Sequence, residues 1–592
     1  MIRLSELRLP LAALPLDPEQ HPDTALHALA ALAAQTLGLA PEAIATLRVH
    51  KRSFDARKAE LLAVYIVDVA LADAAQESAL LAQHAGHPHI QPTPDMAWRP
   101  VGQAPAGFQE RPVVVGFGPC GIFAALVLAQ MGFKPIVLER GKAVRERTQD
   151  TWGLWRRREL NPESNVQFGE GGAGTFSDGK LYSQIKDPRH LGRKVLQEFV
   201  AAGAPPEILY TAHPHIGTFR LVKMVQELRA QIIALGGEVR FEQRVTDLLL
   251  DGRRLRGLRV LDLPSGQESE LATTYAVIAL GHSARDSFAM LHGHGVAMQA
   301  KPFSLGVRIE HPQSVIDRAR WGKDAGHPLL GAADYKLVHH AQHGQASGRT
   351  VYSFCMCPGG TVVAATSEPG RVVTNGMSQY SRAERNANAG MVVGVEPADY
   401  PRDPAAFEAA LGATHGVEAL AAGQTHPLAG IVLQRQLESR AFVLGGGDYN
   451  APAQRVGDFL ARRASTALGE VQPSYQPGVT LIDMHDALPA YATAAMREAL
   501  PAFARKIRGY DMQDAVLTGV ETRTSAPLRI DRGEDFQSLN TEGLFPAGEG
   551  AGYAGGILSA GVDGIKVGEA VACAMLGLPV PSSGARGSGG AA

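Results

Sequence analysis

The segment PVVVGFGPCGIFAALVLAQMGFKPIVLERG spans residues 112–141 and decides the fold class of this 592-residue chain. It runs through an apolar strand, a glycine turn, a helix, a second apolar strand and an acid. Gly116 permits the tight turn, Gly118 lets the backbone approach a pyrophosphate, and Gly121 lets the helix pack closely against the strand. This order predicts a βαβ unit that binds a dinucleotide.

The same unit supplies partners for the charged and hydroxyl groups of such a ligand. Pro119 opens the helix, whose N-terminus presents unpaired N–H groups and the positive end of the helix dipole to a phosphate. Glu139 closes the second strand about 20 residues after the turn, where a carboxylate can accept hydrogen bonds from both ribose hydroxyls. We therefore expect the cofactor to contact Gly116, Gly118, Pro119, Gly121, Glu139 and Arg140.

Composition excludes several classes of protein. The chain is 45% hydrophobic and 20% charged, has a net charge of −2 and contains no Lys/Arg block, so we expect no nucleic-acid partner. The N-terminal sequence lacks the uninterrupted apolar core of a signal peptide, and no run of about 18 apolar residues predicts a membrane span. The four cysteines form no disulfide framework and no metal-ligand cluster, so we expect no metal. These features predict a cytoplasmic protein with no membrane partner, and they leave any protein partner unknown.

Residues 1–86 have the pattern of a small α/β unit. Its helical and strand patterns resemble a ferredoxin-like split βαβ unit and cover residues 23–38, 45–54, 60–71 and 74–86. A basic hairpin in this unit is either a contact for a partner or a solvated face, and it contains Lys51, Arg52, Arg57 and Lys58. The proline-rich residues 87–111 predict a linker, and residues 579–592 predict a flexible tail.

A second glycine-rich segment, NVQFGEGGAGTFSDGKLYS, covers residues 165–183. Its glycines leave backbone amides bare, which suits close approach to a phosphate or a flat ring. Its embedded aromatic residues indicate an ordered loop, although a flexible surface loop is the alternative. The predicted contacts are Gly172, Gly174, Thr175, Phe176, Ser177 and Lys180.

The strands that follow predict a departure from the parallel sheet and a return to it. Residues 238–250 and 255–263 look like an antiparallel meander that contains Val245, and residues 275–281 predict a buried strand that ends at Gly281. This layout resembles the FAD domains of the glutathione-reductase type. In that resemblance, Val245 and Gly281 are further cofactor contacts.

The segment LFPAGEGAGYAGGILSAGVDGIKVGEA, residues 544–570, gives a short strand, an acid and a glycine-rich turn into a helix. In flavoproteins of this fold, such a segment brings an acid to the ribityl chain and aims a helix N-terminus at the pyrimidine edge of the flavin. A positive dipole end there stabilises the negative charge of reduced flavin. Glu549 stands where many such proteins have Asp. The expected contacts are Gly548, Glu549, Gly556 and Ile557.

Several unusual strings recur together at residues 213–218, 351–390, 434–460 and 519–530. With the motifs above, they resemble a bacterial family of FAD-dependent, or NAD(FAD)-utilising, dehydrogenases. The resemblance implies an α/β fold: a Rossmann-like FAD domain of the glutathione-reductase type, an inserted α+β substrate domain, and the small N-terminal ferredoxin-like domain. The implied FAD domain is discontinuous, over residues 112–300 and 516–578, and the insert covers residues 301–515. The resemblance implies no particular substrate.

Three residues are candidates for catalysis. Lys180 can act as a hydrogen-bond donor to the flavin, Tyr553 can place a phenol beside the ring, and Cys355 can act as a thiol. On an extended strand, the Cα atoms of Cys355 and Cys357 would lie about 6.5–7 Å apart, at the limit for a disulfide, which disfavours a redox pair. The alternative is that both thiols are packed as small hydrophobic groups.

The sequence predicts an oxidoreductase that holds FAD without a covalent bond and exchanges hydride with a small organic substrate. After residue 141 no second GxGxxG occurs with a strand, helix and acid, so NAD(P)H would bind only transiently as an electron donor. The arginine forks of Arg435 and Arg440 suit an acidic substrate, although surface ion pairs are the alternative. A flavin-dependent monooxygenase and a non-catalytic FAD-binding sensor are the rival functions.

Overall fold

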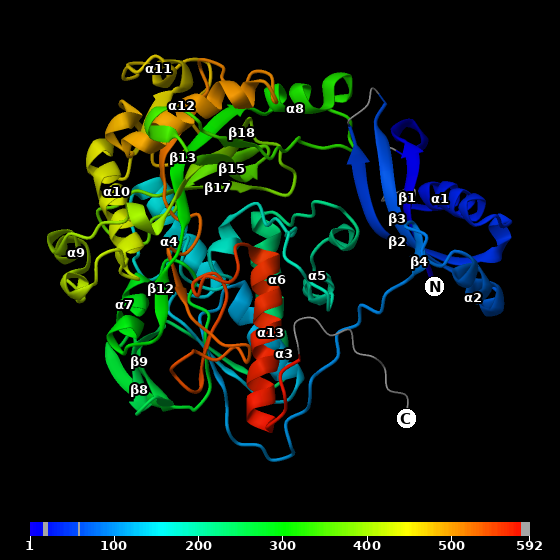
Figure 1. The fold of residues 1–592 in the computed structure, drawn as a ribbon, viewed down its shortest axis with the longest axis horizontal. Helices are drawn as coiled ribbons and strands as arrows, with labels where there is room; N and C mark the ends of the chain where they lie inside the picture. Colours follow the sequence, from blue (N-terminus) through cyan, green and yellow to red (C-terminus); the bar gives the residue numbers. More distant parts are fainter. Residues whose placement is uncertain (16–21, 57–59, 582–592) are drawn as a thin grey trace.

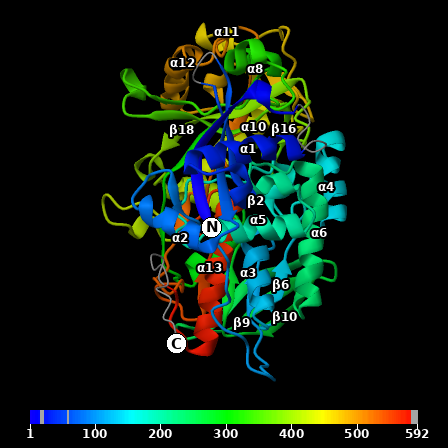
Figure 2. The same ribbon diagram turned by 90° about the vertical axis from the view of Figure 1, so that its right-hand side faces the viewer.

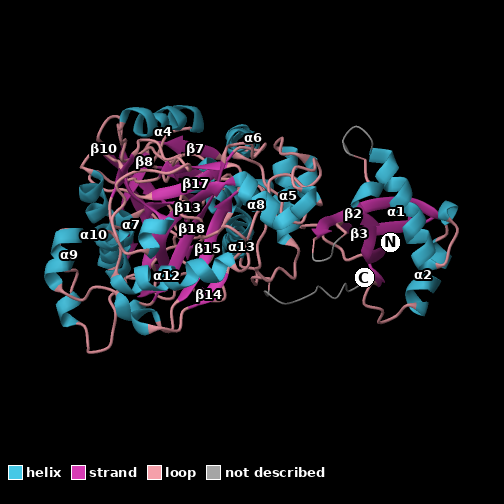
Figure 3. Ribbon diagram, turned by 90° about the horizontal axis from the view of Figure 1, so that it is seen from above, coloured by secondary structure: helices cyan, strands magenta, loops and turns pink. Residues whose placement is uncertain are grey.

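The computed structural model describes residues 1–15, 22–56 and 60–581, and it is an α/β protein with mixed sheets that include a parallel one. A small N-terminal unit stands to one side of a larger body (Figures 1 and 3). Arg57, Lys58 and most of the predicted tail lie outside the described residues. None of the helices in the described part of the chain has the length and apolar character needed to cross a bilayer.

The N-terminal unit has the β-α-β-β-α-β order of a ferredoxin-like unit, with strand order β2-β3-β1-β4. Alternate residues of β1 and β3 point to one face and are buried there, among them Leu4 and Val67. The sequence patterns missed β1 and β4, which complete the sheet. The elements are β1 (Ile2–Pro10), α1 (Pro22–Leu37), β2 (Ile44–Asp55), β3 (Leu62–Leu71), α2 (Ala74–Gln83) and β4 (Ile90–Pro92).

The segment after this unit is attached to the body. Strand β4 lies past the predicted boundary at residue 86 and pairs with β1. Beyond it, the Trp98 indole N–H donates to Glu569 Oε1 at 2.9 Å, and the Ala104 N–H donates to the Met131 carbonyl at 2.8 Å. The predicted linker therefore runs along the body with fixed contacts.

The N-terminal unit also contacts the body through its edge strand β2. The Arg52 N–H donates to the Tyr210 carbonyl at 2.6 Å, and the Ala212 N–H donates to the Arg52 carbonyl at 2.9 Å. The Arg52 guanidinium lies 5.4 Å from the Tyr210 ring centroid. Figure 2 shows the unit in front of the body, with β2 beside α5 (Leu191–Ala201). Part of the predicted basic hairpin therefore contacts this chain's own body.

A five-stranded parallel sheet with strand order β23-β11-β5-β6-β7 lies at the centre of the body. Strand β11 pairs with β5 and β23, as the pattern at residues 275–281 predicted. Between β7 and β11, strands β8, β9 and β10 form an antiparallel meander, whereas residues 238–241, which were expected in it, form β7 of the parallel sheet. The strands are β5 (Val113–Val115), β6 (Ile136–Glu139), β7 (Glu238–Phe241), β8 (Gln243–Asp251), β9 (Arg254–Asp262), β10 (Gln267–Ala272), β11 (Ala276–Ile278) and β23 (Leu544–Pro546).

Two helices from opposite ends of the body's sequence pack closely against each other on this sheet: α3 (Pro119–Gln130) and α13 (Ile557–Leu576) (Figure 1). Glycines permit the approach, because a Cβ at Gly564 would lie 2.2 Å from the Cys120 carbonyl oxygen and one at Gly568 would lie 2.5 Å from Val127. This packing brings the start of α13 beside the glycine turn. The other helices here are α4 (Val144–Arg157), α6 (Thr218–Ala234) and α7 (Arg285–Gly293).

The insert is built on a seven-stranded mixed sheet in the order β14-β15-β18-β13-β21-β19-β20. Strand β21 pairs with β13 and β19, so this sheet extends past the predicted domain boundary at residue 515. Its strands are β13 (Phe303–Pro312), β14 (Val338–His340), β15 (Thr350–Cys357), β18 (Asn386–Val395), β19 (Ala451–Arg455), β20 (Val479–Leu481) and β21 (Val516–Glu521).

The remaining elements of the insert cover this sheet or join it to the parallel sheet. Strands β12 and β22 pair where the chain enters and leaves the insert. They and the others are β12 (Met298–Ala300), β16 (Gly360–Ala364), β17 (Thr374–Ser378), β22 (Leu528–Ile530), α8 (Gln313–Trp321), α9 (Pro404–Leu411), α10 (Ala429–Gly445), α11 (Val456–Leu460) and α12 (Ala490–Ala504).

Candidate active site

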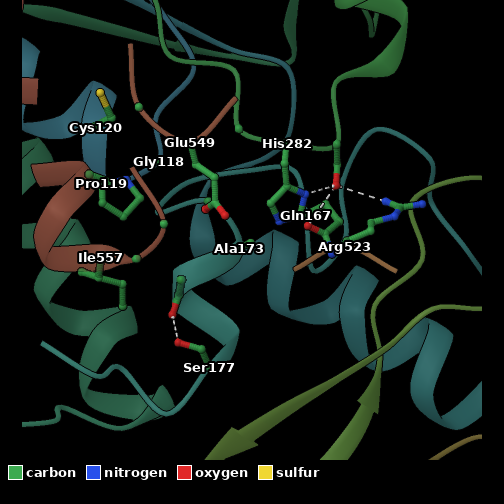
Figure 4. Close-up of a pocket in the computed structure, with 18 of the residues that line it drawn as sticks. Gly118, Pro119, Cys120, Gln167, Ala173, Ser177, His282, Arg523, Glu549 and Ile557 are labelled. Atoms are coloured by element: carbon green, nitrogen blue, oxygen red, sulfur yellow. Dashed lines mark hydrogen bonds between the residues drawn. The ribbon is translucent and has the colours of Figure 1, made fainter. Parts of the chain in front are cut away.

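A cavity of about 520 Å³ lies between the carboxyl ends of the parallel strands and the inserted sheet. We name its two ends by the segments that line them. The turn end is lined by residues 115–120, 138–140 and 243–245, and the insert end by residues 335–336, 352–356 and 523–524 with Lys180 and Tyr182. The glycine-rich loop and the segment after β23 lie between the two ends (Figure 4).

Most of the residues predicted as site residues from the sequence line this cavity. Gly121, Thr175, Phe176 and Tyr553 lie outside its lining. Those that line it are Gly116, Gly118, Pro119, Glu139, Arg140, Gly172, Gly174, Ser177, Lys180, Val245, Gly281, Cys355, Gly548, Glu549, Gly556 and Ile557.

The three glycines of the turn have different roles. A Cβ at Gly116 would lie 2.3 Å from the Ala279 carbonyl oxygen, and one at Gly121 would lie 1.9 Å from the Gly116 carbonyl oxygen. These two glycines therefore permit packing of the turn and the helix. Gly118 has an extended backbone, with φ −80°, and its Cβ would meet only the Gly172 Cα, at 3.7 Å. Gly118 thus leaves open space where α3 begins without a side-chain cap.

Glu139 joins the turn to the glycine-rich loop. Its Oε2 accepts a hydrogen bond from the Phe117 N–H at 2.8 Å, and its Oε1 accepts from Gly141 and Gly169 at 2.8 and 2.9 Å. A carboxylate oxygen has two lone-pair sites, so Oε1 is saturated and Oε2 keeps one site. The expectation of ribose contacts stays a prediction, and these backbone donors leave room on Oε2 for one further hydrogen bond.

Arg140 forms part of the cavity wall with its charge neutralised. Its guanidinium pairs with Glu163 and Asp286, both at 2.8 Å, and lies 4.3 Å from the Phe168 ring centroid. These contacts hold the planar group against the aromatic ring. Arg140 therefore shapes the wall, and its charge is already balanced by carboxylates.

The buried Arg147 orders the glycine-rich loop. Its guanidinium donates to the carbonyls of Asn165, Val166, Gly169, Glu170 and Gly172. No sequence pattern indicated this residue, because an arginine on a helix gives no local signal of contacts about 20 residues away.

Two of the contacts predicted in this loop belong to its underside. The Thr175 hydroxyl donates to the Glu170 carbonyl at 3.3 Å, and the Phe176 ring packs edge-on against Trp155 at 6.0 Å. Both side chains are buried. Their side chains anchor the loop from below, and the expectation that these two residues contact a cofactor stays a prediction.

The segment after β23 places an acid in the middle of the cavity. The Glu549 side chain points toward the cavity beside His282 and Ala173 (Figure 4). Burial raises the pKa of this carboxyl to about 8, although nearby Lys301 opposes the shift. Glu549 is therefore mainly protonated at neutral pH and can donate a hydrogen bond.

Helix α13 begins beside this acid. Its N-cap is Gly556 and no side chain caps it. A Cβ at Gly555 would meet nothing within 4 Å, so the backbone in front of the helix faces open cavity. The N-terminal N–H groups of α13 can thus donate hydrogen bonds to an anionic group or to the polar edge of a ligand.

Tyr553 lies away from the cavity and packs against an arginine. Its hydroxyl accepts a hydrogen bond from the Arg532 backbone N–H at 3.1 Å, and the Arg532 guanidinium lies 3.7 Å from its ring centroid. Arg532 in turn pairs with Asp563. These contacts hold Tyr553 outside the lining of the cavity, and its predicted place beside a cofactor ring stays a prediction.

His282, Gln167 and Arg523 lie near Glu549 (Figure 4), and each of the three has a hydrogen-bond contact with Ser283. The Ser283 hydroxyl donates to Gln167 Oε1 at 3.2 Å, accepts from Arg523 Nη1 at 3.1 Å and lies 3.0 Å from His282 Nδ1. Because that hydroxyl already donates its proton, His282 Nδ1 carries the proton and Nε2 is an acceptor. Burial and the cations Arg523 and Arg285 lower the pKa of His282 to about 3, so its ring is neutral.

Buried ion pairs hold this group in place. Glu438 accepts from Arg285 at 2.7 Å and from Arg523 at 2.9 Å, and Arg285 also pairs with Glu368 at 2.5 Å. Burial alone raises the pKa of Glu438, but the two arginines outweigh it and lower the pKa. The cluster joins α7, α10 and the segment after β21. The sequence analysis missed it, because its members are far apart in the chain.

At the insert end, Lys180 contacts the strand that carries the two cysteines. Its Nζ donates to the Met356 carbonyl and lies 4.0 Å from Asp178 Oδ2. Burial alone lowers the pKa of Lys180, but Cys357 and Asp178 outweigh it and raise the pKa. Lys180 therefore stays charged against the wall of the cavity.

Strand β15 is not regularly extended at the cysteines. Its register against β18 shifts between Phe354 and Cys357, and Cys355 has a left-handed backbone with φ +41°. Arg308 Nη1 and Cys357 Sγ both donate to the Cys355 carbonyl, at 2.8 and 3.3 Å. The extended-chain spacing that disfavoured a redox pair therefore does not apply here.

Neither arginine suggested for an acidic substrate lines the cavity. Arg435 pairs with Glu368 and donates to the Ala410 carbonyl at 2.8 Å, and Arg440 is exposed on α10. The alternative of ordinary ion pairing describes Arg435. Within the described ranges, no cluster of His, Cys, Asp and Glu could hold a metal ion.

Comparison with known proteins identifies two matched regions. Residues 302–524 match the family described as FAD-dependent protein, C-terminal domain-like, and residues 1–70 match a domain of unknown function. An uncharacterized protein of Clostridium beijerinckii is 45% identical over 551 residues, which cover 92% of this chain and 96% of that one.

The solved structures that match this chain share little sequence with it. Escherichia coli quinol fumarate reductase is 12% identical, with a TM-score of 0.35 over 79% of this chain and 71% of that chain. The Bacillus halodurans glycerol-3-phosphate dehydrogenase is 11% identical, with a TM-score of 0.34 over 81% and 67% of the two chains. On the sequence matches, the chain belongs to the family of the Clostridium beijerinckii protein and carries the FAD-dependent protein C-terminal domain.

Proposed function

We propose that this protein is an FAD-dependent oxidoreductase that exchanges hydride with a small organic substrate. One observation carries the proposal: a single cavity is lined at one end by a dinucleotide turn and at the other by the inserted sheet. The proposed FAD domain is of the glutathione-reductase type. Its insert runs to about residue 524, because β21 belongs to the inserted sheet.

The residues present fit FAD. Gly118, Gly281 and Gly556 leave space in the cavity wall that a Cβ would enter. Two helix N-termini without side-chain caps, those of α3 and α13, border the same cavity. The first suits a pyrophosphate and the second suits the pyrimidine edge of a flavin. A volume of about 520 Å³ lies within the range typical of cofactor sites.

FAD bound there would supply the chemistry of hydride acceptance and donation. The chain's own groups bind and orient it. The remaining lone-pair site of Glu139 can accept one hydrogen bond from the ribose, and protonated Glu549 can donate one to the ribityl region. Neutral His282 offers Nε2 as an acceptor, while Lys180 holds a positive charge at the insert end.

Substrate and electron donor would reach the flavin from the insert end. This end is lined by Tyr335, Tyr352 and Phe354, and Tyr182 and Lys336 at its margin are exposed. Aromatic side chains with a few polar groups are typical of sites for small organic ligands. We propose that NAD(P)H, if it is the donor, binds there transiently, since the dinucleotide turn is assigned to FAD.

The experiment begins with the purified protein. Denaturation should release FAD, and anaerobic stopped-flow mixing with NADH and NADPH should bleach the flavin absorbance. Release of FMN, or no flavin at all, would overturn the proposal. Fast oxidation of NAD(P)H with peroxide release and no substrate would favour a monooxygenase. A flavin that neither nicotinamides nor dithionite can reduce would indicate a sensor.

A further inference from the structure

We propose that Cys355 and Cys357 are a redox-active dithiol pair that passes electrons between the flavin and a substrate of the thiol/disulfide class. The proposal rests on the function above for the flavin step, whereas thiol chemistry of the pair can be tested without flavin. It assigns a role to Cys355 at the insert end and to its neighbour Cys357. Neither thiol has a role in the proposed binding of FAD.

The bulge of β15 brings the two thiols together. In a regular strand, residues two positions apart are about 6.5–7 Å apart and point the same way. Here the left-handed backbone of Cys355 and the register shift turn the chain, and the Cys357 thiol donates to the Cys355 carbonyl at 3.3 Å. The bulge thus holds the Cys357 sulfur against the backbone of Cys355.

The two thiols have unequal access to the cavity. Cys355 lines the cavity and is partly exposed, whereas Cys357 is 0% exposed. An accessible thiol with a buried neighbour is the arrangement in which one sulfur attacks a substrate and the other resolves the mixed disulfide. Cys355 is therefore the attacking sulfur and Cys357 the resolving one.

Fixed cations favour the charged form of the attacking thiol. The neighbouring Cys357 thiol, followed by Arg308 and Lys180, lowers the pKa of Cys355, although burial opposes the shift. Both cations are held close to the bulge, because Arg308 donates to the Cys355 carbonyl and Lys180 donates to the Met356 carbonyl, while Arg308 also pairs with Glu521 at 2.6 Å. The pKa of Cys357 is raised, mainly by the neighbouring Cys355 thiol and by burial.

A substrate disulfide would be reduced in two thiol–disulfide exchange steps. The Cys355 thiolate attacks one sulfur, the substrate S–S bond breaks, and the first thiolate leaves. Cys357 then loses its proton and attacks the Cys355 sulfur, which releases the second thiolate and leaves a Cys355–Cys357 disulfide. One leaving thiolate takes the Cys357 proton and the other takes a proton from solvent. The Cys355–Cys357 disulfide then takes up two electrons from reduced FAD and two protons, which restores the dithiol. NAD(P)H supplies the electrons to FAD.

The first test needs no flavin. Apo-protein and FAD-loaded protein are equilibrated in buffers of reduced and oxidised glutathione, quenched in acid, alkylated and digested for mass spectrometry. The parent and the control Cys573→Ser, which removes a buried thiol on α13, should form a reversible Cys355–Cys357 disulfide. Cys355→Ser and Cys357→Ser should not form it. Reduced thiols at both positions in the most oxidising buffer would overturn the proposal.

The second test connects the pair to the flavin. Anaerobic dithiothreitol should bleach the flavin of the parent and of Cys573→Ser, and the rate should fall at least 100-fold in Cys355→Ser with equal FAD content. An unchanged rate would overturn the relay. If NADH or NADPH still reduces the flavin of that variant, the oxidoreductase proposal stands alone. If neither the parent nor any variant binds FAD, the glutathione test still shows whether Cys355 and Cys357 form a reversible disulfide.

Discussion

The turn end of the cavity contains two glycines and the uncapped start of α3, whereas the insert end is lined by aromatic, charged and thiol-bearing residues. At the turn end, glycines and a free helix N-terminus come from one stretch of about 30 residues, and a single carboxylate, Glu139, joins them to the next loop. At the insert end, Lys180, Cys355 and Arg523 come from three distant segments. The comparison shows that residues close together in the sequence can form a cofactor-binding site. The insert end instead depends on packing between segments that are far apart in the sequence.

The largest expected effect concerns the ion pairs that hold the insert end. Glu438→Ala would leave Arg285 and Arg523 buried without their main partner, so we expect a loss of about 3–5 kcal/mol in the free energy of unfolding. The control is Glu542→Ala, which breaks an exposed pair with Arg254 and should change the free energy of unfolding far less. Urea unfolding followed by circular dichroism measures both. Equal losses would show that buried charges do not hold this end.

Next in size is the effect of filling the turn end. In Gly118→Val, the extended backbone accepts a β-branched residue, but the side chain enters the space assigned to the pyrophosphate. We expect FAD affinity to fall at least about 100-fold, or about 2.7 kcal/mol, with little change in melting temperature. Titration of apo-protein with FAD gives the affinity. Gly293→Val, where a Cβ meets nothing within 4 Å, is the control. A variant that binds FAD like the parent would place the phosphate elsewhere.

A smaller effect is expected from a side chain at the insert end. Lys180→Met removes a fixed positive charge without removing the bulk of the side chain, so flavin reduction should slow by about 10-fold while FAD content stays constant. Lys186→Met, in an exposed part of the same loop, should leave the rate unchanged. Anaerobic stopped-flow traces and flavin content give the two readouts. If the variant loses FAD, but the molecules that keep FAD are reduced at the parent rate, Lys180 would contribute to FAD binding and not to flavin reduction.

The smallest predicted effect is a pH dependence of protein stability. It originates at Glu549, between the two ends of the cavity. Because burial raises the pKa of Glu549 to about 8, the folded apo-protein holds a proton that the unfolded chain releases near its ordinary pKa of 4.5. The stability from this group is fully present below that ordinary pKa and is lost as pH rises through about 8. In Glu549→Gln, the melting temperature should therefore fall less than that of the parent over this window.

Differential scanning fluorimetry of the apo-protein checks this prediction. Glu542→Gln, at an exposed position just before β23, serves as the control and should follow the parent at every pH. Parallel curves for Glu549→Gln and the parent would mean that the carboxyl of Glu549 is already ionised at neutral pH.

The sequence predicted the elements whose structure depends on neighbouring residues. The turn at residues 116–121, the start of α13 after Gly556 and the return of β11 to the parallel sheet follow from strand and helix periodicity and from glycine spacing. Strands β1 and β4 were missed, since a nine-residue strand with a bulge and a three-residue strand carry weak periodic signals.

By itself, the sequence determined the turn end, because tight turns and helix N-termini depend on residues a few positions apart. Only the tertiary structure decided which side chains face the cavity. It placed Thr175, Phe176 and Tyr553 behind the wall, attached the glycine-rich loop to Arg147, and assembled Arg285, Glu368, Glu438 and Arg523 into one cluster. It also set the bulge that brings Cys355 and Cys357 together. The physical reason is that buried side-chain hydrogen bonds and ion pairs join residues brought together by packing, over separations that local sequence patterns do not encode.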